Sequence, residues 1–231
     1  SEMCIRDRLT YDRTYIIDLT GRTPEKIAAA MPKDGRRGVK RAERVAKEAG
    51  VVIKDETGMD RATFDEVYRV LEETSERDGF TPHSADVYWT MLTTLGEQAR
   101  MYVARLDGRP VAWVLVVVNG ISSVAYYGAS TTADRATRAA EATDWYAACD
   151  LAAKGYKGYD FMGAGSTRVP ELYSVGMYKK RFAQHPTEVD GAWDVPVQRP
   201  VFEALVAAKK AKHLVRKATV VASKASEAIK R

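Results

Sequence analysis

Lys179, next to Tyr178 in the segment YKKRF, is the residue whose type and setting best suit chemistry at an oxygen atom. A lysine ammonium can stabilise negative charge that develops on oxygen during a reaction. Three further pieces, which begin at Ala125, precede it: the segment AYYGAS, a run with helical spacing, and the segment GYKGYDFMGAG. Taken alone, Lys179 is better explained as a surface lysine of the run Lys179-Lys180-Arg181. Its assignment therefore depends on the other pieces.

Tyr127 and Ser130 lie where a predicted strand gives way to a loop, a place where side chains and backbone donors can face a cleft. Successive strand residues point to opposite faces of a sheet, so Tyr126 and Tyr127 are expected on different faces. We assign Tyr126 to the core. Tyr127, which adjoins Gly128, is the candidate site residue.

In order and spacing these pieces resemble the motifs of the Fem (FemABX) aminoacyltransferases, which build the interpeptide bridges of peptidoglycan. The resemblance runs from about Thr14 to Trp193 and also takes in RRGVKRAERVAKEAGV and RDGF. It implies an α/β (α+β) GNAT-like acyltransferase domain and the tRNA-dependent addition of an amino acid to the stem peptide of a peptidoglycan precursor. Proteins of this family carry two similar domains, and the resemblance covers the second together with the C-terminal tail.

The resemblance also implies roles for individual residues. Lys179 would stabilise the oxyanion or the ribose oxygen that leaves from the tRNA end, and Tyr127 would help to organise the transfer, which makes both catalytic. Arg77, in RDGF, resembles a ligand of the precursor's diphosphate, and the family shows a similar Arg-x-x-x-Lys opening where Arg36, Arg37 and Lys40 begin a basic helix. For these cations a solvated surface is the competing interpretation. The substrate-binding candidates are Arg77, Arg37, Lys40, Ser130 and Tyr178.

Composition and charge suit a soluble protein with anionic partners. The 231 residues are 45% hydrophobic and 29% charged, with a net charge of +5. A basic excess suits polyanionic partners such as tRNA or pyrophosphate-bearing precursors, although a solvated basic surface is the more common cause of such a balance. The partners that the resemblance implies are aminoacyl-tRNA and a UDP-linked or lipid-linked muropeptide precursor. The longest apolar run, Val111 to Val118, is too short to cross a bilayer, and no signal-peptide pattern opens the chain. We expect a cytoplasmic monomer with at most peripheral contact with the inner membrane surface.

Metal and cofactor chemistry find little support in the sequence. Cys4 and Cys149 are the only cysteines, which excludes a disulfide framework and a cysteine-based metal cluster. The three histidines are isolated from one another, so neither a zinc site nor a Ser-His-Asp triad is indicated. The segment GAGSTR lacks the second half of a dinucleotide fingerprint. No metal and no bound cofactor are expected, and aminoacyl-tRNA would be a co-substrate.

Periodicity and turn residues predict the elements. Helical spacing and caps indicate helices over about 24–31, 33–49, 60–78, 84–96 and 142–155, and β-rich runs indicate strands over about 14–19, 51–54, 101–106, 111–118, 122–128 and 159–161. Asp107-Gly108 and Asn119-Gly120 predict hairpins, and hence an antiparallel meander. The next helix returns the chain to a strand that should pair in parallel. The expected architecture is a mixed, mostly antiparallel sheet flanked by helices.

The ends of the chain are treated separately. Residues 1–8, SEMCIRDR, resemble a translated sequencing adapter and are set aside. Residues 9–193 form the expected GNAT-like domain, and residues 194–231 a basic helical tail with one long helix from Val201. We expect that the first GNAT-like domain of the parent protein is missing and that the tail would pack on it. Binding of the tail to anionic lipid or to tRNA is the alternative.

Two other functions remain open from the sequence. A GNAT N-acetyltransferase would bind acetyl-CoA phosphates on the loop STTADRATR, but this loop has no glycine and carries Asp134, which disfavours a backbone cradle. The other possibility is an inactive, truncated fragment that binds RNA or membrane through its basic helices.

Overall fold

The computed structural model describes residues 6–8, 11–190, 192–194, 196–208 and 211. The chain divides into a large unit, residues 10–190, and a small unit made of residues 1–9 and 191–231. In the small unit, β1 (Arg6–Arg8) pairs antiparallel with β9 (Ala192–Asp194), and residues 199–208 are helical. β1 therefore falls within the segment that the sequence analysis set aside. Most of the predicted tail helix lies outside the described residues.

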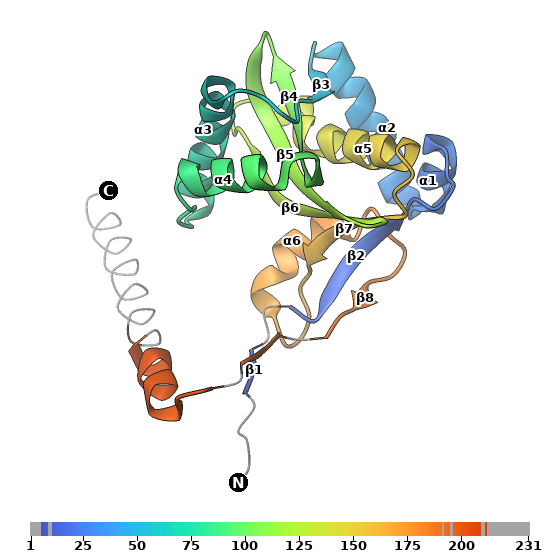
Figure 1. Ribbon diagram of the computed structural model, residues 1–231. Helices are drawn as coiled ribbons and strands as arrows, with labels where there is room; N and C mark the ends of the chain where they lie inside the picture. Colours follow the sequence, from blue (N-terminus) through green and yellow to red (C-terminus); the bar gives the residue numbers. More distant parts are fainter. Residues whose placement is uncertain (1–5, 9–10, 191, 195, 209–210, 212–231) are drawn as a thin grey trace, which may run out of the picture. The chain divides into compact units, whose positions relative to one another are not determined.

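A seven-stranded sheet lies at the centre of the large unit (Figure 1), in the order β3-β4-β5-β6-β7-β2-β8. The β6–β7 pair is parallel and the other neighbours are antiparallel. This confirms the mixed, mostly antiparallel sheet and the parallel return after the meander. The strands are β2 (Arg13–Asp18), β3 (Val52–Asp55), β4 (Ala99–Leu106), β5 (Arg109–Asn119), β6 (Ser122–Ser130), β7 (Gly158–Gly163) and β8 (Thr187–Glu188).

Helices cover both faces of this sheet (Figure 1). One face carries α1 (Pro24–Ala30), α2 (Lys33–Glu48) and α5 (Ala139–Ala153), whose apolar side chains meet those of β2 and β7 in one core. The other face carries α3 (Arg61–Asp78) and α4 (Ala85–Leu95) over a second core. Within the described part of the chain, no helix combines the length and the apolar character needed to cross a membrane.

Local signals explain several boundaries. The Asp60 carboxylate accepts a hydrogen bond from the Thr63 amide at 2.7 Å and begins α3, as predicted, because it satisfies an amide that has no helical partner. Gly79 ends the helix with φ +73°, a conformation that costs glycine little. Asp107 and Gly108 both have positive φ, as the tight β4–β5 turn requires.

The short helix α6 (Tyr173–Lys179) was not predicted. It follows the 3-10 turn η3 (Pro170–Leu172) and contains Gly176, which would weaken a helix in isolation. The structure requires that glycine, since a Cβ there would lie 2.9 Å from the Gly165 amide nitrogen, and a Cβ on Gly165 would lie 2.5 Å from the Tyr173 nitrogen. The two glycines let α6 approach the loop after β7.

Gly35 is the position in α2 that tolerates a side chain least. A Cβ at Gly35 would lie 1.6 Å from the Arg181 carbonyl oxygen, which is a backbone atom and cannot swing aside. We expect Gly35→Ala to lower the free energy of unfolding by about 1–3 kcal/mol, although alanine is the better helix former, because α2 and the segment after α6 must separate. Urea denaturation measures the change. Arg41→Ala, at an exposed site of the same helix, is the matched control and should shift stability by less than about 0.5 kcal/mol; equal effects of the two would contradict the clash.

Candidate active site

The sheet opens between β6 and β7. These parallel strands pair only from Ser122–Val124 to Gly158–Asp160, although β6 continues to Ser130 and β7 to Gly163. Beyond the paired residues β6 keeps its pairing with β5, and β7 keeps its pairing with β2. Beyond Val124 and Asp160 the two strands are no longer paired with each other, and we call this unpaired part of the sheet the opening.

Lys179 lies at the β7 side of this opening. Its Nζ donates a hydrogen bond to the Gly163 carbonyl oxygen at 2.7 Å, which fixes the end of α6 to the end of β7. Burial lowers the pKa of Lys179, and the nearby carboxylates of Asp144 and Asp160 oppose that shift. A half-buried ammonium beside an opening in a sheet can stabilise a developing oxyanion, because little water competes for its charge.

Tyr178, the residue before Lys179, points into the core. Its hydroxyl donates to Asp144 Oδ2 at 2.5 Å, and the Tyr159 hydroxyl donates to Asp144 Oδ1 at 2.9 Å. Its ring also packs against Phe161 and Phe182. The structure thus gives Tyr178 a role in anchoring α6 beneath Lys179, and its predicted contact with substrate stays a prediction.

Asp144 is enclosed by these two phenols on the α5 side of the sheet. Burial raises the pKa of Asp144 to about 6, although the hydrogen bonds from Tyr178 and Tyr159 and the charge of Lys179 act in the opposite direction. The folded protein therefore binds this proton more tightly than the unfolded chain, whose value is 3.8. The stability that this difference contributes is fully present below pH 3.8 and is lost as the pH rises through about 6.

Asp144→Asn tests this linkage. We expect the free energy of unfolding of the wild type, relative to that of the Asn variant, to fall between pH 4 and pH 7, because the variant does not titrate. Any loss from the weaker hydrogen bonding of an amide to two phenols is the same at every pH and cancels in the comparison. Urea denaturation of both proteins across this range gives the result, and a constant difference would rule the linkage out.

The two adjacent tyrosines of β6 do not follow the expected alternation. The register between β5 and β6 shifts between Leu115 and Val116, so that Tyr126 occupies a bulge. The Tyr126 and Tyr127 rings meet edge to face at 4.8 Å, and Tyr126 is 43% exposed. The assignment of Tyr126 to the core is therefore wrong, because the bulge turns its side chain out of the sheet face.

Tyr127 packs against the α3–α4 core, with its ring 4.8 Å from that of Tyr88. Burial raises the pKa of its phenol, and Tyr88 and Tyr126 add to the shift. No contact between Tyr127 and Lys179 is described.

Arg77 and Ser130 are brought together at the far end of β6. The Arg77 Nη1 donates to the Ser130 carbonyl oxygen at 2.8 Å, and its guanidinium forms an ion pair with Asp78. The hydroxyl of Thr74 also donates to the Ser130 carbonyl, at 3.0 Å. These contacts fasten the C-terminal turn of α3 to β6, and phosphate binding by Arg77 would have to compete with them.

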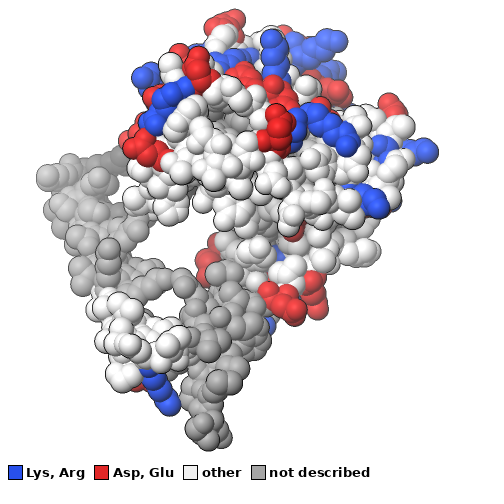
Figure 2. All heavy atoms as spheres, in the orientation of Figure 1, with Lys and Arg blue, Asp and Glu red and all other residues white. Residues whose placement is uncertain are grey.

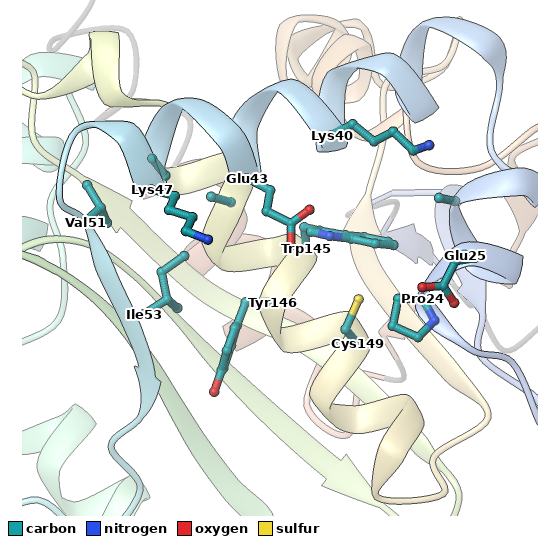
Figure 3. A pocket seen from close by; sticks show the side chains of 13 residues that line it. Pro24, Glu25, Lys40, Glu43, Lys47, Val51, Ile53, Trp145, Tyr146 and Cys149 are labelled. Carbon is teal, nitrogen blue, oxygen red and sulfur yellow. The ribbon is translucent and has the colours of Figure 1, made fainter.

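Arg37 and Lys40 are exposed on α2, and Lys40 lines a different pocket (Figure 3). This pocket, of about 390 Å³, lies between α1, α2, α5 and β3, with Trp145 and Cys149 in its wall. In Figure 3, Lys47 and Glu43 extend from α2 toward it. Burial raises the pKa of the Cys149 thiol to about 12, which agrees with the sequence-based view of an inert cysteine.

A buried carboxylate connects α5 with the segment after Lys179. Glu141, whose side chain is 8% exposed, forms ion pairs with Arg138 and with Arg181. A Cβ on Gly38 would lie 2.9 Å from the Glu141 carboxylate, so the glycine of RRGVK allows α2 to pack over this pair. Sequence reasoning missed Glu141, as well as Asp144 and Asp160. The signal available was a set of three acidic residues placed within otherwise apolar or small-residue stretches.

In the loop before α5, the Asp134 carboxylate and several backbone amides are hydrogen-bonded within the protein. Each oxygen of the Asp134 carboxylate accepts a hydrogen bond from the Arg109 guanidinium at 2.7 Å, and one of them also accepts a hydrogen bond from the Thr131 hydroxyl at 2.7 Å. Amides of residues 131, 132, 135, 137 and 138 donate to acceptors of the protein. Among the described residues, no three His, Cys, Asp or Glu side chains are grouped so as to hold a metal ion.

Charges of both signs are mixed on the face shown in Figure 2. Blue and red side chains alternate over the upper end of the large unit, and much of the centre of this face is uncharged. The described charged residues on this face therefore do not form a single basic surface.

The part of the chain that contains the antiparallel meander, the crossover helix α5 and Lys179 matches a known family model. Residues 33–180 match the model described as an acetyltransferase (GNAT) domain. The chain belongs to the GNAT acetyltransferase family. The predicted fold class is thereby confirmed.

Solved structures agree on the fold of this GNAT chain. It is similar to the crystal structure of FemX, with a TM-score of 0.71 and 15% identity over 87% of this chain and 68% of that one. It is also similar to the C-terminal domain of a putative lysylphosphatidylglycerol synthetase from Agrobacterium fabrum, with a TM-score of 0.61 and 14% identity over 89% of this chain and 66% of that one. L-PGS from Bacillus licheniformis gives a TM-score of 0.57 and 13% identity, with the same shares covered.

At these identities the similarity shows the fold alone. The chain spans about two thirds of the length of each of the three structures. Comparison with curated proteins gave no match. The FemX similarity bears out the Fem resemblance at the level of the fold.

Proposed function

We propose that this GNAT domain transfers an amino acid from aminoacyl-tRNA to an amine on the stem peptide of a peptidoglycan precursor. The observation that carries the proposal is the Lys179 ammonium, half-buried and hydrogen-bonded to the Gly163 carbonyl, beside the opening between β6 and β7. The order of the sequence motifs and the similarity in fold to FemX support it. The second and third similar structures are those of a putative lysylphosphatidylglycerol synthetase and of L-PGS, which fits aminoacyl transfer on this fold.

The reaction needs few groups from the protein. A neutral acceptor amine attacks the ester carbonyl carbon of the aminoacyl-tRNA, and a C–N bond forms while the carbonyl oxygen becomes negative. The Lys179 ammonium would lie against that oxygen. The C–O ester bond then breaks, the ribose oxygen leaves and takes up the proton lost by the amine, and an amide remains.

The same fold could use acetyl-CoA, and the two donors can be separated by experiment. We expect transfer of a labelled amino acid from a mixture of aminoacyl-tRNAs to a UDP-linked or lipid-linked muropeptide, with loss of the signal after ribonuclease treatment. Label transferred from acetyl-CoA instead, or tight binding of CoA in a calorimeter, would replace the proposal by N-acetyl transfer. Transfer from neither donor, in a protein that is folded, would favour a binding function without catalysis.

The proposed partners follow from this reaction. Aminoacyl-tRNA and the muropeptide precursor would be met in the cytoplasm, and a lipid-linked acceptor would bring the protein into peripheral contact with the inner membrane surface. Comparing UDP-linked and lipid-linked acceptors in the same assay distinguishes the two sources.

A further inference from the structure

β7, the strand whose Gly163 carbonyl accepts the hydrogen bond from Lys179, contains a bulge of its own in addition to the one at Tyr126 in β6. In the β2–β7 pair, Thr14 lies opposite Gly163 and Ile16 lies opposite Asp160, so two residues of β7, Phe161 and Met162, face one residue of β2. Met162 has φ +60°, a left-handed conformation that costs a non-glycine residue about 1–2 kcal/mol. Such a conformation persists only when surrounding contacts impose it.

Two polar side chains impose it here. The Asp160 Oδ1 accepts a hydrogen bond from the Met162 amide at 2.6 Å. The Thr14 hydroxyl is hydrogen-bonded to the same Asp160 oxygen and lies 2.9 Å from the Met162 carbonyl oxygen. Thr14 is fully buried, so water does not replace these contacts. The pair therefore holds both backbone groups of Met162.

The bulge decides where the next carbonyl points. The Gly163 carbonyl oxygen accepts a hydrogen bond from the Lys179 ammonium at 2.7 Å. On its other side Gly163 is covered by Tyr11, since a Cβ there would lie 2.8 Å from the Tyr11 ring. The Asp160 carboxylate also interacts electrostatically with Lys179. Thr14 and Asp160 thus act on Lys179 through the backbone, and Asp160 also acts through its charge.

We propose that Thr14 and Asp160 are positioning residues for Lys179, holding the Met162 bulge so that the Gly163 carbonyl fixes the ammonium beside the opening of the sheet. This inference rests on the proposed function for its catalytic consequence. The placement of the ammonium itself can be tested without any substrate. The sequence analysis singled out neither residue; Thr14 lies on β2 and Asp160 on the neighbouring strand β7.

The first test measures the Lys179 amine directly. The probe is acetic anhydride, which reacts with neutral amines, and the extent of labelling of each lysine is followed by mass spectrometry as a function of pH. Two carboxylates face Lys179, those of Asp144 and Asp160, and both favour its charged form. We expect Asp160→Asn to move the midpoint of Lys179 labelling to lower pH, while the midpoint of the exposed neighbour Lys180 stays where it is. An unchanged Lys179 midpoint would overturn the role of Asp160.

The second test separates positioning from simple stability. We expect Thr14→Val, which keeps the shape but lacks the hydroxyl, to lower kcat by about 10- to 100-fold with little change in KM, because a misplaced catalytic group acts mainly on the transition state. Thr14→Ser, which keeps the hydroxyl, should restore most of kcat. Equal kcat values for the Val and Ser variants, both folded by circular dichroism, would overturn the role of Thr14.

The two tests fail in different ways. If no aminoacyl transfer is found in the wild type, the proposed function fails, but the labelling profile of Asp160→Asn still decides whether Asp160 acts on Lys179. If transfer is found and neither variant changes Lys179 labelling or kcat, the positioning role fails and the function stands. If Thr14→Val does not fold, Asp160→Asn decides the outcome: an unchanged midpoint of Lys179 labelling together with an unchanged kcat would overturn the positioning role.

Discussion

Replacing Lys179 by alanine is expected to lower turnover by about 10²- to 10³-fold, with a much smaller change in KM for the acceptor. This is the size of effect seen when one preorganised donor to an oxyanion is removed. The charge would act mainly in the transition state, where the ester oxygen becomes negative, and so the loss falls on kcat. The measurement is steady-state transfer of a labelled amino acid to the muropeptide acceptor.

Lys180→Ala is the matched control for this substitution. Lys180 is the next residue in the chain, carries the same charge and is exposed at the end of α6. It should leave kcat within about twofold of the wild type, since an exposed charge outside the opening contributes little. Similar losses in both variants would mean that the basic segment binds tRNA as a whole, and would remove Lys179 from the chemical step.

The pH dependence of turnover adds a second readout for Lys179. Burial lowers the pKa of this ammonium, so its charged form is lost at a lower pH than that of a free lysine. We therefore expect kcat to fall on the alkaline side before an ordinary lysine would titrate. Lys179→Ala should abolish this alkaline limb of the profile.

Replacing Glu141 by alanine is expected to have the largest effect on stability, about 3–5 kcal/mol. The substitution leaves Arg138 and Arg181 facing each other without the carboxylate that both bind, and these arginine side chains are only 23% and 33% exposed. Desolvated cations without a partner are costly, whereas the intact pair is close to neutral relative to apolar residues. Urea denaturation at pH 7 measures the change.

Glu48→Ala is the control for Glu141. Glu48 pairs with Arg44 one turn away on the surface of α2, and both side chains are more than 60% exposed. An exposed pair of this type contributes at most about 0.5 kcal/mol. A loss at Glu141 no larger than the loss at Glu48 would show that the Glu141 cluster is solvated in solution and does not hold α5 to the segment after Lys179.

Much of the fold follows from local sequence. The Asp107-Gly108 turn, the cap at Asp60 and the glycine stop at Gly79 act through neighbouring residues only, so their effects can be predicted without the rest of the molecule. The apolar stripes of α2 and α3 also identify their buried faces, as at Val39, Ala42 and Phe64.

The candidate site followed from the sequence only in part. The motif order identified Lys179, but the packing of Tyr178, the bulge at Tyr126 and the helix α6 were not foreseen. The alternation rule fails at Tyr126 because a single extra residue in one strand reverses the faces of the residues beyond it. α6 was missed because Gly176 is unfavourable for an isolated helix and is selected by the close approach of Gly165.

The sequence by itself determined most of the helices and strands, their order and the antiparallel meander, because these depend on residue type and spacing along the chain. It also singled out the lysine that we propose for acyl transfer. The tertiary structure alone decided where β6 and β7 separate, and which groups surround the lysine. Thr14 and Asp160 are 146 residues apart, and Arg181 and Glu141 are 40 apart. Hydrogen bonds and ion pairs over such separations form only after the sheet has closed around its two cores, so no local pattern could have reported them.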